Sequence, residues 1–299
     1  MSLNANHVTN LLNIDGTTVD LVDINSGIEA FKAKISQGRL TLTSNTPVLS
    51  SSVTGATTLY YTPYIGSQIS IWDGSKWSVR TFTERSLSLS GLAANTNYDV
   101  FVFDNAGTLT LEAVAWSNSG AGTSARASAL SFLNGVRVKD SDKRKYLGSF
   151  RTTATIGQTE FVNNNLPSSL LIKNEFNRIP LSLFLQEGST AHTYTTNTWR
   201  NYNNSNTYKF NLLTIDNENI DFSLNLTMSN SLHITVSISN TIWNNIYWGL
   251  TVSDAIFIRA SASLSTTVNG FNDFQIVERG NGTVAGSSQQ LSAYLQTHY

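Results

Sequence analysis

Two consecutive hairpin patterns between residues 59 and 116 constrain the fold more than any other feature of the chain. Leu59–Trp77 reads LYYTPYIGSQISIWDGSKW, and Asn97–Trp116 reads NYDVFVFDNAGTLTLEAVAW. Each piece alternates apolar and polar residues around a turn sequence, Asp73-Gly74 in the first and residues 104–107 in the second. Because alternation places one face of a strand on a core and these turn residues favour tight reversals, the pattern predicts two antiparallel β-hairpins.

Short alternating segments continue along most of the chain and predict an all-β fold. Strands separated by turns every 8–12 residues are typical of β-sandwich or jelly-roll domains. A chain of 299 residues is long for one such domain, so we expect two. The predicted division is an extended N-terminal arm (1–38), a β-rich platform domain (39–156), a linker (157–167) and a C-terminal β-sandwich domain (168–299).

Three segments carry more specific expectations. In the arm, Ser26–Ser36 predicts a short helix, and the arm has too few apolar residues for a core of its own, so we expect it to pack on another subunit. In the C-terminal domain, Ile220–Met228 and Ser231–Ile238 alternate on either side of Ser229-Asn230, which predicts a third hairpin. For Ser287–Tyr299, a helix and a closing strand both remain open. The sequence shows no coiled-coil heptad run.

Composition excludes several classes of function. Charged residues make up 13% of the chain, about half the usual share, and the net charge of −1 provides no basic field for nucleic acid. The absence of cysteine excludes disulfides and thiolate sites. No apolar run approaches the roughly 20 residues that span a bilayer, and residues 1–16 lack a secretory signal pattern. We therefore expect synthesis in a cytoplasm, with no membrane insertion and no nucleic-acid partner.

Catalytic and metal-binding patterns are absent from the sequence. None of the four histidines stands at a metal-ligand spacing, so we predict no metal and no cofactor. Glycoside hydrolysis needs two positioned carboxylates. The carboxylates in aromatic surroundings are Asp73, Glu84, Asp99, Asp104 and Glu112. Asp73 and Asp104 are explained as turn residues, and Asp99 and Glu112 are expected to face solvent from strands. The chain is therefore predicted not to be an enzyme.

Aromatic residues provide the remaining candidates for a binding surface. Trp72, Trp77 and Tyr64 suit either a sugar-stacking platform or the core, and the core is favoured. A second set lies in the C-terminal domain, where residues 243–248 (WNNIYW) combine aromatic and amide side chains. Such a loop suits contact with a glycan or with another subunit. The predicted contact residues are Trp199, Tyr202, Trp243, Tyr247 and Trp248.

A resemblance to a known family rests on a long motif in the platform domain. The chain carries YYTPYxGxxIx(I/L)xDGxxW, continued by LxGLxxxTNYDVF. Over about residues 39–160 it resembles tail-fibre-like structural proteins of tailed phages and prophages. The resemblance implies a particle component without enzymatic activity, made in the host cytoplasm and located in the virion.

The expected function follows from this resemblance. We expect a subunit of a fibre or appendage on the tail or head, attached to other virion proteins through residues 1–38 and assembled as a homotrimer. The C-terminal domain would contact a host surface glycan. One alternative is a capsid decoration or head-fibre protein with a purely mechanical role. The other, less favoured, is a polysaccharide depolymerase.

Overall fold

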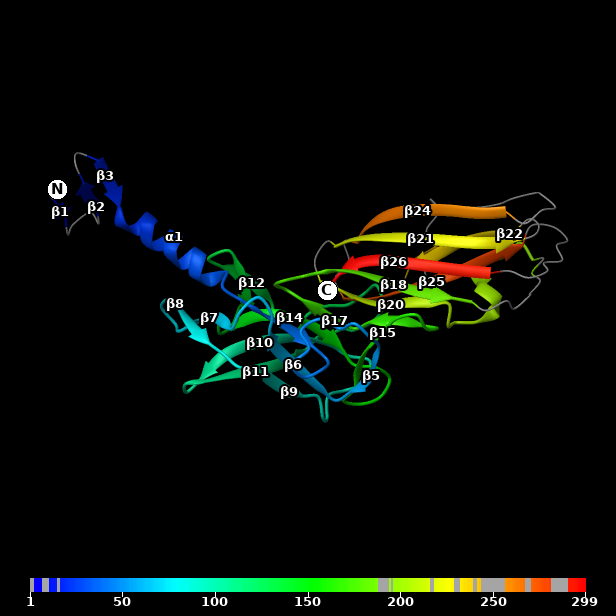
Figure 1. Cartoon of the computed structure of the whole chain (residues 1–299), viewed down its shortest axis with the longest axis horizontal. Helices are drawn as coiled ribbons and strands as arrows, with labels where there is room; N and C mark the ends of the chain where they lie inside the picture. The colour runs from blue at the N-terminus through cyan, green and yellow to red at the C-terminus, as the bar shows by residue number, and fades with distance from the viewer. Residues whose placement is uncertain are drawn as a thin grey trace.

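The computed structural model describes residues 3–6, 11–14, 17–187, 194, 196–215, 218–228, 232–238, 241–242, 256–266, 270–280 and 290–299. Regular structure in these residues is almost entirely β-strand, and α1 (Leu21–Ala33) is the α-helix among them. The expectation of an all-β fold is therefore confirmed. Figure 1 shows a β-rich body with a narrow arm leaving one end.

The arm contains more regular structure than the short helix expected from the sequence. Strands β1 (Leu3–Asn6), β2 (Leu11–Ile14) and β3 (Thr17–Asp20) form a three-stranded antiparallel sheet, and α1 follows β3 without a break. In Figure 1 this sheet lies at the far end of α1, away from the body. The helix begins five residues before the predicted start at Ser26. Asp20 immediately precedes it, and aspartate is a favoured residue before the first turn of a helix.

The platform region contains three sheets. The order β4-β6-β9 joins β4 (Gly38–Thr41), β6 (Thr58–Pro63) and β9 (Arg85–Ser88). Both predicted hairpins are confirmed, as β7–β8 (Gln68–Trp72, Trp77–Thr81) and β10–β11 (Asn97–Asn105, Thr108–Ala115). The third sheet has the order β11-β10-β14-β13-β12, in which the new strands are β12 (Leu130–Leu133), β13 (Val136–Lys139) and β14 (Lys145–Arg151).

The C-terminal region packs two sheets as a sandwich. One has the order β18-β26-β21-β24, comprising β18 (Pro180–Gln186), β21 (Glu218–Met228), β24 (Ile256–Thr266) and β26 (Gln290–His298). The other includes β20 (Lys209–Thr214), β22 (Leu232–Ile238), β23 (Thr241–Ile242) and β25 (Gly270–Gly280), with β19 (Arg200–Asn201) on β25. Phe210 of β20 and Phe222 of β21 meet edge to face across the sandwich, 6.1 Å between ring centroids.

The predicted hairpin around Ser229-Asn230 is wrong. β21 pairs with β24 and β26, whereas β22 pairs with β25 and β23, so the two strands belong to opposite sheets. Alternation shows that each strand has one buried face, but it does not show which strand lies beside it. The open question about Ser287–Tyr299 is answered by β26, a strand inserted between β18 and β21.

The segment expected as a linker, residues 157–167, contains a paired strand. β15 (Thr159–Val162) lies between β5 (Val53–Ala56) and β16 (Ser168–Leu170), so the larger C-terminal sheet reaches into the platform region. In return, β17 (Ile172–Asn174) pairs with β14 in the platform sheet. Strand pairing therefore crosses the expected boundary in both directions.

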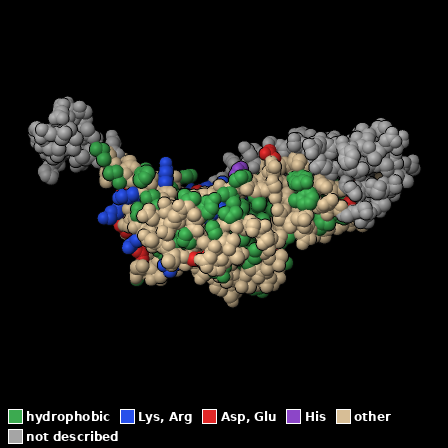
Figure 2. Space-filling model, viewed as in Figure 1, with side chains coloured by type: hydrophobic (Ala, Val, Ile, Leu, Met, Phe, Trp, Pro, Cys, Tyr) green, Lys and Arg blue, Asp and Glu red, His purple; other side chains and the backbone are tan. Residues whose placement is uncertain are grey.

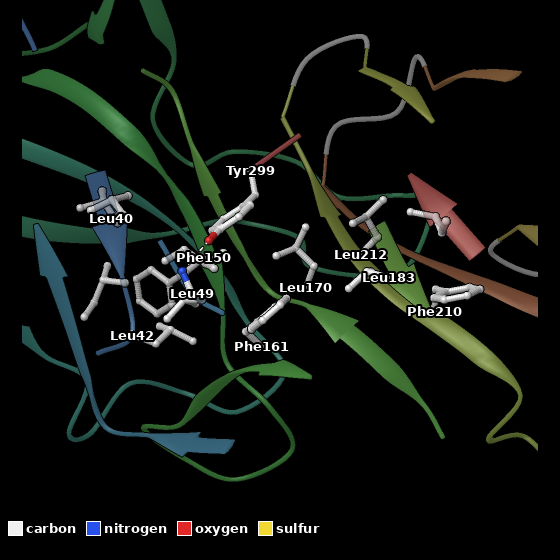
Figure 3. Packing of buried hydrophobic residues seen from close by; sticks show 14 of the residues in the cluster. Leu40, Leu42, Leu49, Phe150, Phe161, Leu170, Leu183, Phe210, Leu212 and Tyr299 are labelled. Carbon is white, nitrogen blue, oxygen red and sulfur yellow. Dashed lines mark hydrogen bonds between the residues drawn. The ribbon is translucent and has the colours of Figure 1, made fainter. Parts of the chain in front are cut away.

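A continuous hydrophobic core joins the two regions. Figure 3 shows its middle, where Tyr299 points toward Leu49 and Phe161, and the cluster as a whole contains side chains from both sides of the expected boundary. The backbone N–H of Leu49 donates to Tyr299 Oη at 2.8 Å, and the Tyr299 and Phe161 rings stack at 6.2 Å. Burying a large apolar side chain contributes about 1.5–3 kcal/mol, so these contacts bind the regions to one another.

Candidate functional site

The base of the arm is fixed to the body through the last turn of α1. Ala33 is fully buried and packs in a cluster with Trp77, Val136 and Val138. One turn earlier, Glu29 Oε2 accepts the backbone N–H of Trp77 at 2.5 Å, and this hydrogen bond lowers the pKa of Glu29. Strand β8, which begins at Trp77, therefore holds one side of the helix.

A buried lysine closes the end of the same helix. Lys145 is 1% exposed, and its Nζ donates to the carbonyl oxygens of Ala33 at 2.9 Å and Ile35 at 2.7 Å, and to Ser70 Oγ at 3.0 Å. Burial lowers the pKa of Lys145 to about 7. The carbonyl groups at the C-terminal end of a helix attract a cation, so the hydrogen bonds of the Lys145 amine attach the end of α1 to the body.

The rest of the arm leaves apolar side chains uncovered by the described part of the chain. Val22, Ile24, Ile28 and Phe31 are all exposed on α1. Figure 2 shows hydrophobic side chains, in green, along the arm where it leaves the body. Apolar surface that its own chain does not bury is a common sign of an interaction surface. The sequence predicted a helix here but not how much of it would stay exposed.

A cavity of about 450 Å³ lies beside the β7–β8 and β10–β11 hairpins. Two of its carboxylates, Asp73 and Asp104, have structural roles. The cavity is lined by residues that include Trp72, Asp73, Phe103, Asp104 and Arg144. Asp73 accepts the backbone N–H groups of the following turn, which lower its pKa, and Asp104 accepts the Gly107 N–H at 2.6 Å and Arg80 Nη2 at 2.8 Å. Their predicted role as turn residues is confirmed.

Asp99 does not face solvent, which corrects the expectation for this residue. It is 1% exposed, and its carboxylate accepts Arg126 Nε at 2.9 Å and Ser149 Oγ at 2.7 Å. The Arg126 guanidinium also lies 4.5 Å from the centre of the Trp116 ring. Burial raises the pKa of Asp99, while Arg126 favours its charged form. β10 is a central strand with both faces covered, so a polar residue on it needs a buried partner.

Other sequence candidates are also placed by the structure. Trp77 is fully buried, as the core interpretation predicts, whereas Trp72 is half-buried and Tyr64 is exposed. Residues 143–145 form a run of three basic side chains (KRK) between β13 and the start of β14. Lys143 pairs there with Asp140 at 2.9 Å, but Lys145 points into the core as described above.

The predicted contact residues of the C-terminal region do not form one surface in the described structure. Tyr202 is fully buried and packs edge to face on Tyr208, so it belongs to the core. Burial and the nearby Glu187 carboxylate raise its pKa. Trp199 is half-buried, with the Arg279 guanidinium 5.0 Å from its ring centre. Trp243, Tyr247 and Trp248 lie outside the described residues, so for them glycan or partner contact stays a prediction.

The structure contains an ion pair next to Trp199 that no sequence pattern indicates. Glu278 is fully buried on β25, and Arg200 Nε donates to its Oε1 at 2.8 Å. The same guanidinium lies 3.8 Å from the ring centre of Tyr194. The residues are 78 positions apart, and no spacing in the sequence connects them.

Within the described residues, no group of three or more His, Asp or Glu side chains is placed to hold a metal ion. No helix in the described part of the chain is sufficiently long and apolar to cross a membrane.

Comparisons with known proteins add little. No family model and no curated protein matches the sequence. Among solved structures, the chain is similar to the insecticidal delta-endotoxin Cry8Ea1 of Bacillus thuringiensis, with 8% identity over 87% of this chain and 51% of the toxin, at a TM-score of 0.25. It is also similar to the VP2 subviral particle of infectious bursal disease virus, with 8% identity over 89% of this chain and 72% of that one, at a TM-score of 0.25. The chain thus spans about half the length of the toxin, and similarities this low indicate no function.

Proposed function

We propose that this protein is a structural subunit of a tailed-phage particle, forming part of a fibre or appendage on the tail or head. The observation that carries the proposal is the arm, which is fixed at its base to a β-rich body and leaves its apolar side chains uncovered within the described structure. The motif in residues 39–160 supports the same class of protein by resemblance.

The arm and the body have different tasks in this proposal. The arm joins the subunit to other virion proteins and to further copies of the chain, which assemble as a homotrimer. The body, whose two regions share a core, keeps the C-terminal sandwich at a fixed distance from the arm. Trp199 and the loop containing Trp243, Tyr247 and Trp248 would contact a host surface glycan.

The role is mechanical rather than catalytic. The carboxylates that line the hairpin cavity are held by turn N–H groups and an arginine, and Asp99 is buried in an ion pair. These carboxylates are engaged in turns and ion pairs, whereas a glycosidase needs two carboxylates that are positioned on either side of the scissile bond. No cofactor is required.

Locating the full-length protein in an image reconstruction of the particle tests the proposal. A few dozen copies or fewer on the tail or at one vertex would support an appendage, whereas hundreds of copies spread over the head would indicate the decoration protein instead. Absence from purified particles would contradict both. Release of sugar from host polysaccharide by the purified protein would contradict the non-enzymatic role.

A further inference from the structure

The exposed apolar residues of the described structure are concentrated on α1, where three of them lie at helical spacing on one side. Of the ten large hydrophobic residues that are exposed in the described structure, four lie on this helix: Val22 (55%), Ile24 (44%), Ile28 (46%) and Phe31 (73%). Ile24, Ile28 and Phe31 follow one another at spacings of four and three residues. At about 100° per residue, these three side chains fall within an arc of about 60°. They form a narrow stripe, called here the α1 stripe.

The α1 stripe faces away from the protein's own body. Glu29 and Ala33, the residues that contact β8 and the core beneath it, lie on the opposite side of the helix by the same geometry. A helix that only packed on its own body would turn its apolar side toward that body. Here the side that contacts the body carries Glu29 and Ala33, so folding of a single chain does not cover the stripe.

The spacing of the α1 stripe is that of a coiled coil. Within α1, apolar residues stand at positions 21, 24, 28 and 31, which is the 3-4-3 spacing of a and d positions in a heptad. Isoleucine occurs at both position types, as Ile24 (d) and Ile28 (a). This distribution favours three or four strands over two. A pattern shorter than two heptads is too short to predict a coiled coil from the sequence alone. It indicates a helix interface here because the side chains at positions 24, 28 and 31 are exposed in the folded chain.

A glycine beside the stripe supports close approach of another helix. Gly27 stands in the middle of α1, where glycine is unfavourable, and within the described residues nothing lies within 4 Å of a Cβ placed there. Packing within the chain therefore gives no reason for glycine. At the g position it flanks Ile28, where a missing side chain lets a neighbouring backbone approach.

We propose that α1 is the interface through which three copies of this chain pack in parallel, with Ile24, Ile28 and Phe31 as the layers of a short coiled coil. This inference rests on the proposed function, because an appendage with one attached end requires all arms at that end. A three-fold arrangement is closed, so each stripe is covered by two copies of itself. The β1–β3 sheets at the far end then remain available for other virion proteins.

Cysteine cross-linking of the full-length protein tests the register, because the natural chain contains no cysteine. Ile24→Cys and Phe31→Cys should each give a covalent dimer on mild oxidation, since parallel packing brings identical positions together. The matched control is Val22→Cys, which is exposed on the same helix but lies off the stripe and should stay uncrosslinked. Cross-linking only in a mixture of the two stripe variants would indicate antiparallel helices and overturn the proposal.

Sedimentation of the full-length protein tests the number of copies. The wild type should have three times the mass of the 32.7 kDa chain, and the double variant Ile28→Gln, Phe31→Gln should have the mass of one chain. Both side chains are exposed within a single chain, so the body should keep its circular dichroism spectrum. Phe132→Gln, an exposed position on β12, is the control and should stay trimeric.

A wild type that is monomeric at every concentration would overturn the inference and indicate a different partner for the stripe. If such a monomer is still found in particles, the proposed function stands without this interface. If the trimer forms but the protein is absent from particles, the interface stands and the proposed function fails.

Discussion

Replacing Lys145 with methionine should remove a pH dependence of stability that this one residue creates. The pKa of Lys145 is lowered by burial from 10.5 to about 7 in the folded protein. Between these values the unfolded chain binds one more proton than the folded protein. The free energy of unfolding of the wild type therefore rises with pH in this window, with a slope of at most about 1.4 kcal/mol per pH unit.

The size of the effect follows from the same two pKa values. Lys145 is half protonated at pH 7 in the folded state, so its full slope develops only above that pH. From pH 7 to pH 9 the wild type should gain about 2 kcal/mol relative to Lys145→Met. Staying below pH 9 avoids the ionisation of tyrosines, among which Tyr61 has its pKa raised by burial to about 12.

Urea unfolding of both proteins, followed by tryptophan fluorescence at a series of pH values, measures the difference. The matched control is Lys143→Met, which removes a partly exposed amine paired with Asp140 on the same hairpin and leaves the buried site intact. A wild-type-minus-Lys145→Met difference that is constant from pH 7 to pH 9 would refute the reasoning. Such a result would show that water reaches the Lys145 amine beneath α1, so that burial does not lower its pKa.

Three further predictions concern the body, and each is checked by denaturant unfolding. Asp99→Ala leaves the Arg126 guanidinium buried without its carboxylate and should cost about 3–5 kcal/mol, and a loss as small as that of a surface substitution would contradict the ion pair's role. Gly148→Ala should cost about 3 kcal/mol, because at φ +146° its Cβ would lie 2.1 Å from the Lys173 carbonyl oxygen, and unchanged stability would argue against this close approach. Tyr299→Ala should lower the free energy of unfolding by about 3–5 kcal/mol, with the whole body still unfolding in one cooperative transition. Two transitions, of which only one is shifted, would show that the two regions unfold independently.

Local elements were predictable where turn chemistry and alternation agree. The β7–β8 and β10–β11 hairpins follow from Asp73-Gly74 and residues 104–107, because a tight turn makes strands neighbours in sequence pair with one another. The same reasoning failed at Ser229-Asn230, where both flanking strands exist but lie in different sheets. A connection between strands can cross a sandwich as well as reverse along one sheet, and alternation is the same in both cases.

Candidate sites were predictable only where a residue acts on its own neighbours. Asp73 and Asp104 bind N–H groups two or three residues away, so their roles can be inferred locally. Asp99 and Lys145 have partners distant in sequence, and a charge on a strand is expected to face solvent unless those partners are known. Tyr202 was predicted as a contact residue because it belongs to a set of aromatic residues, and it is buried against Tyr208.

The all-β class, the β7–β8 and β10–β11 hairpins and the apolar spacing along α1 follow from the order of residues alone, since they depend on the period of side chains along a strand or helix. Contacts between segments distant in the sequence set three further features: which strands are neighbours, the single core that the two regions share around Tyr299, and the direction in which α1 faces. The body occupies the Glu29 and Ala33 side of α1 and leaves the other side uncovered. Spacing records which residues share a face, but only packing reveals whether their own chain covers that face.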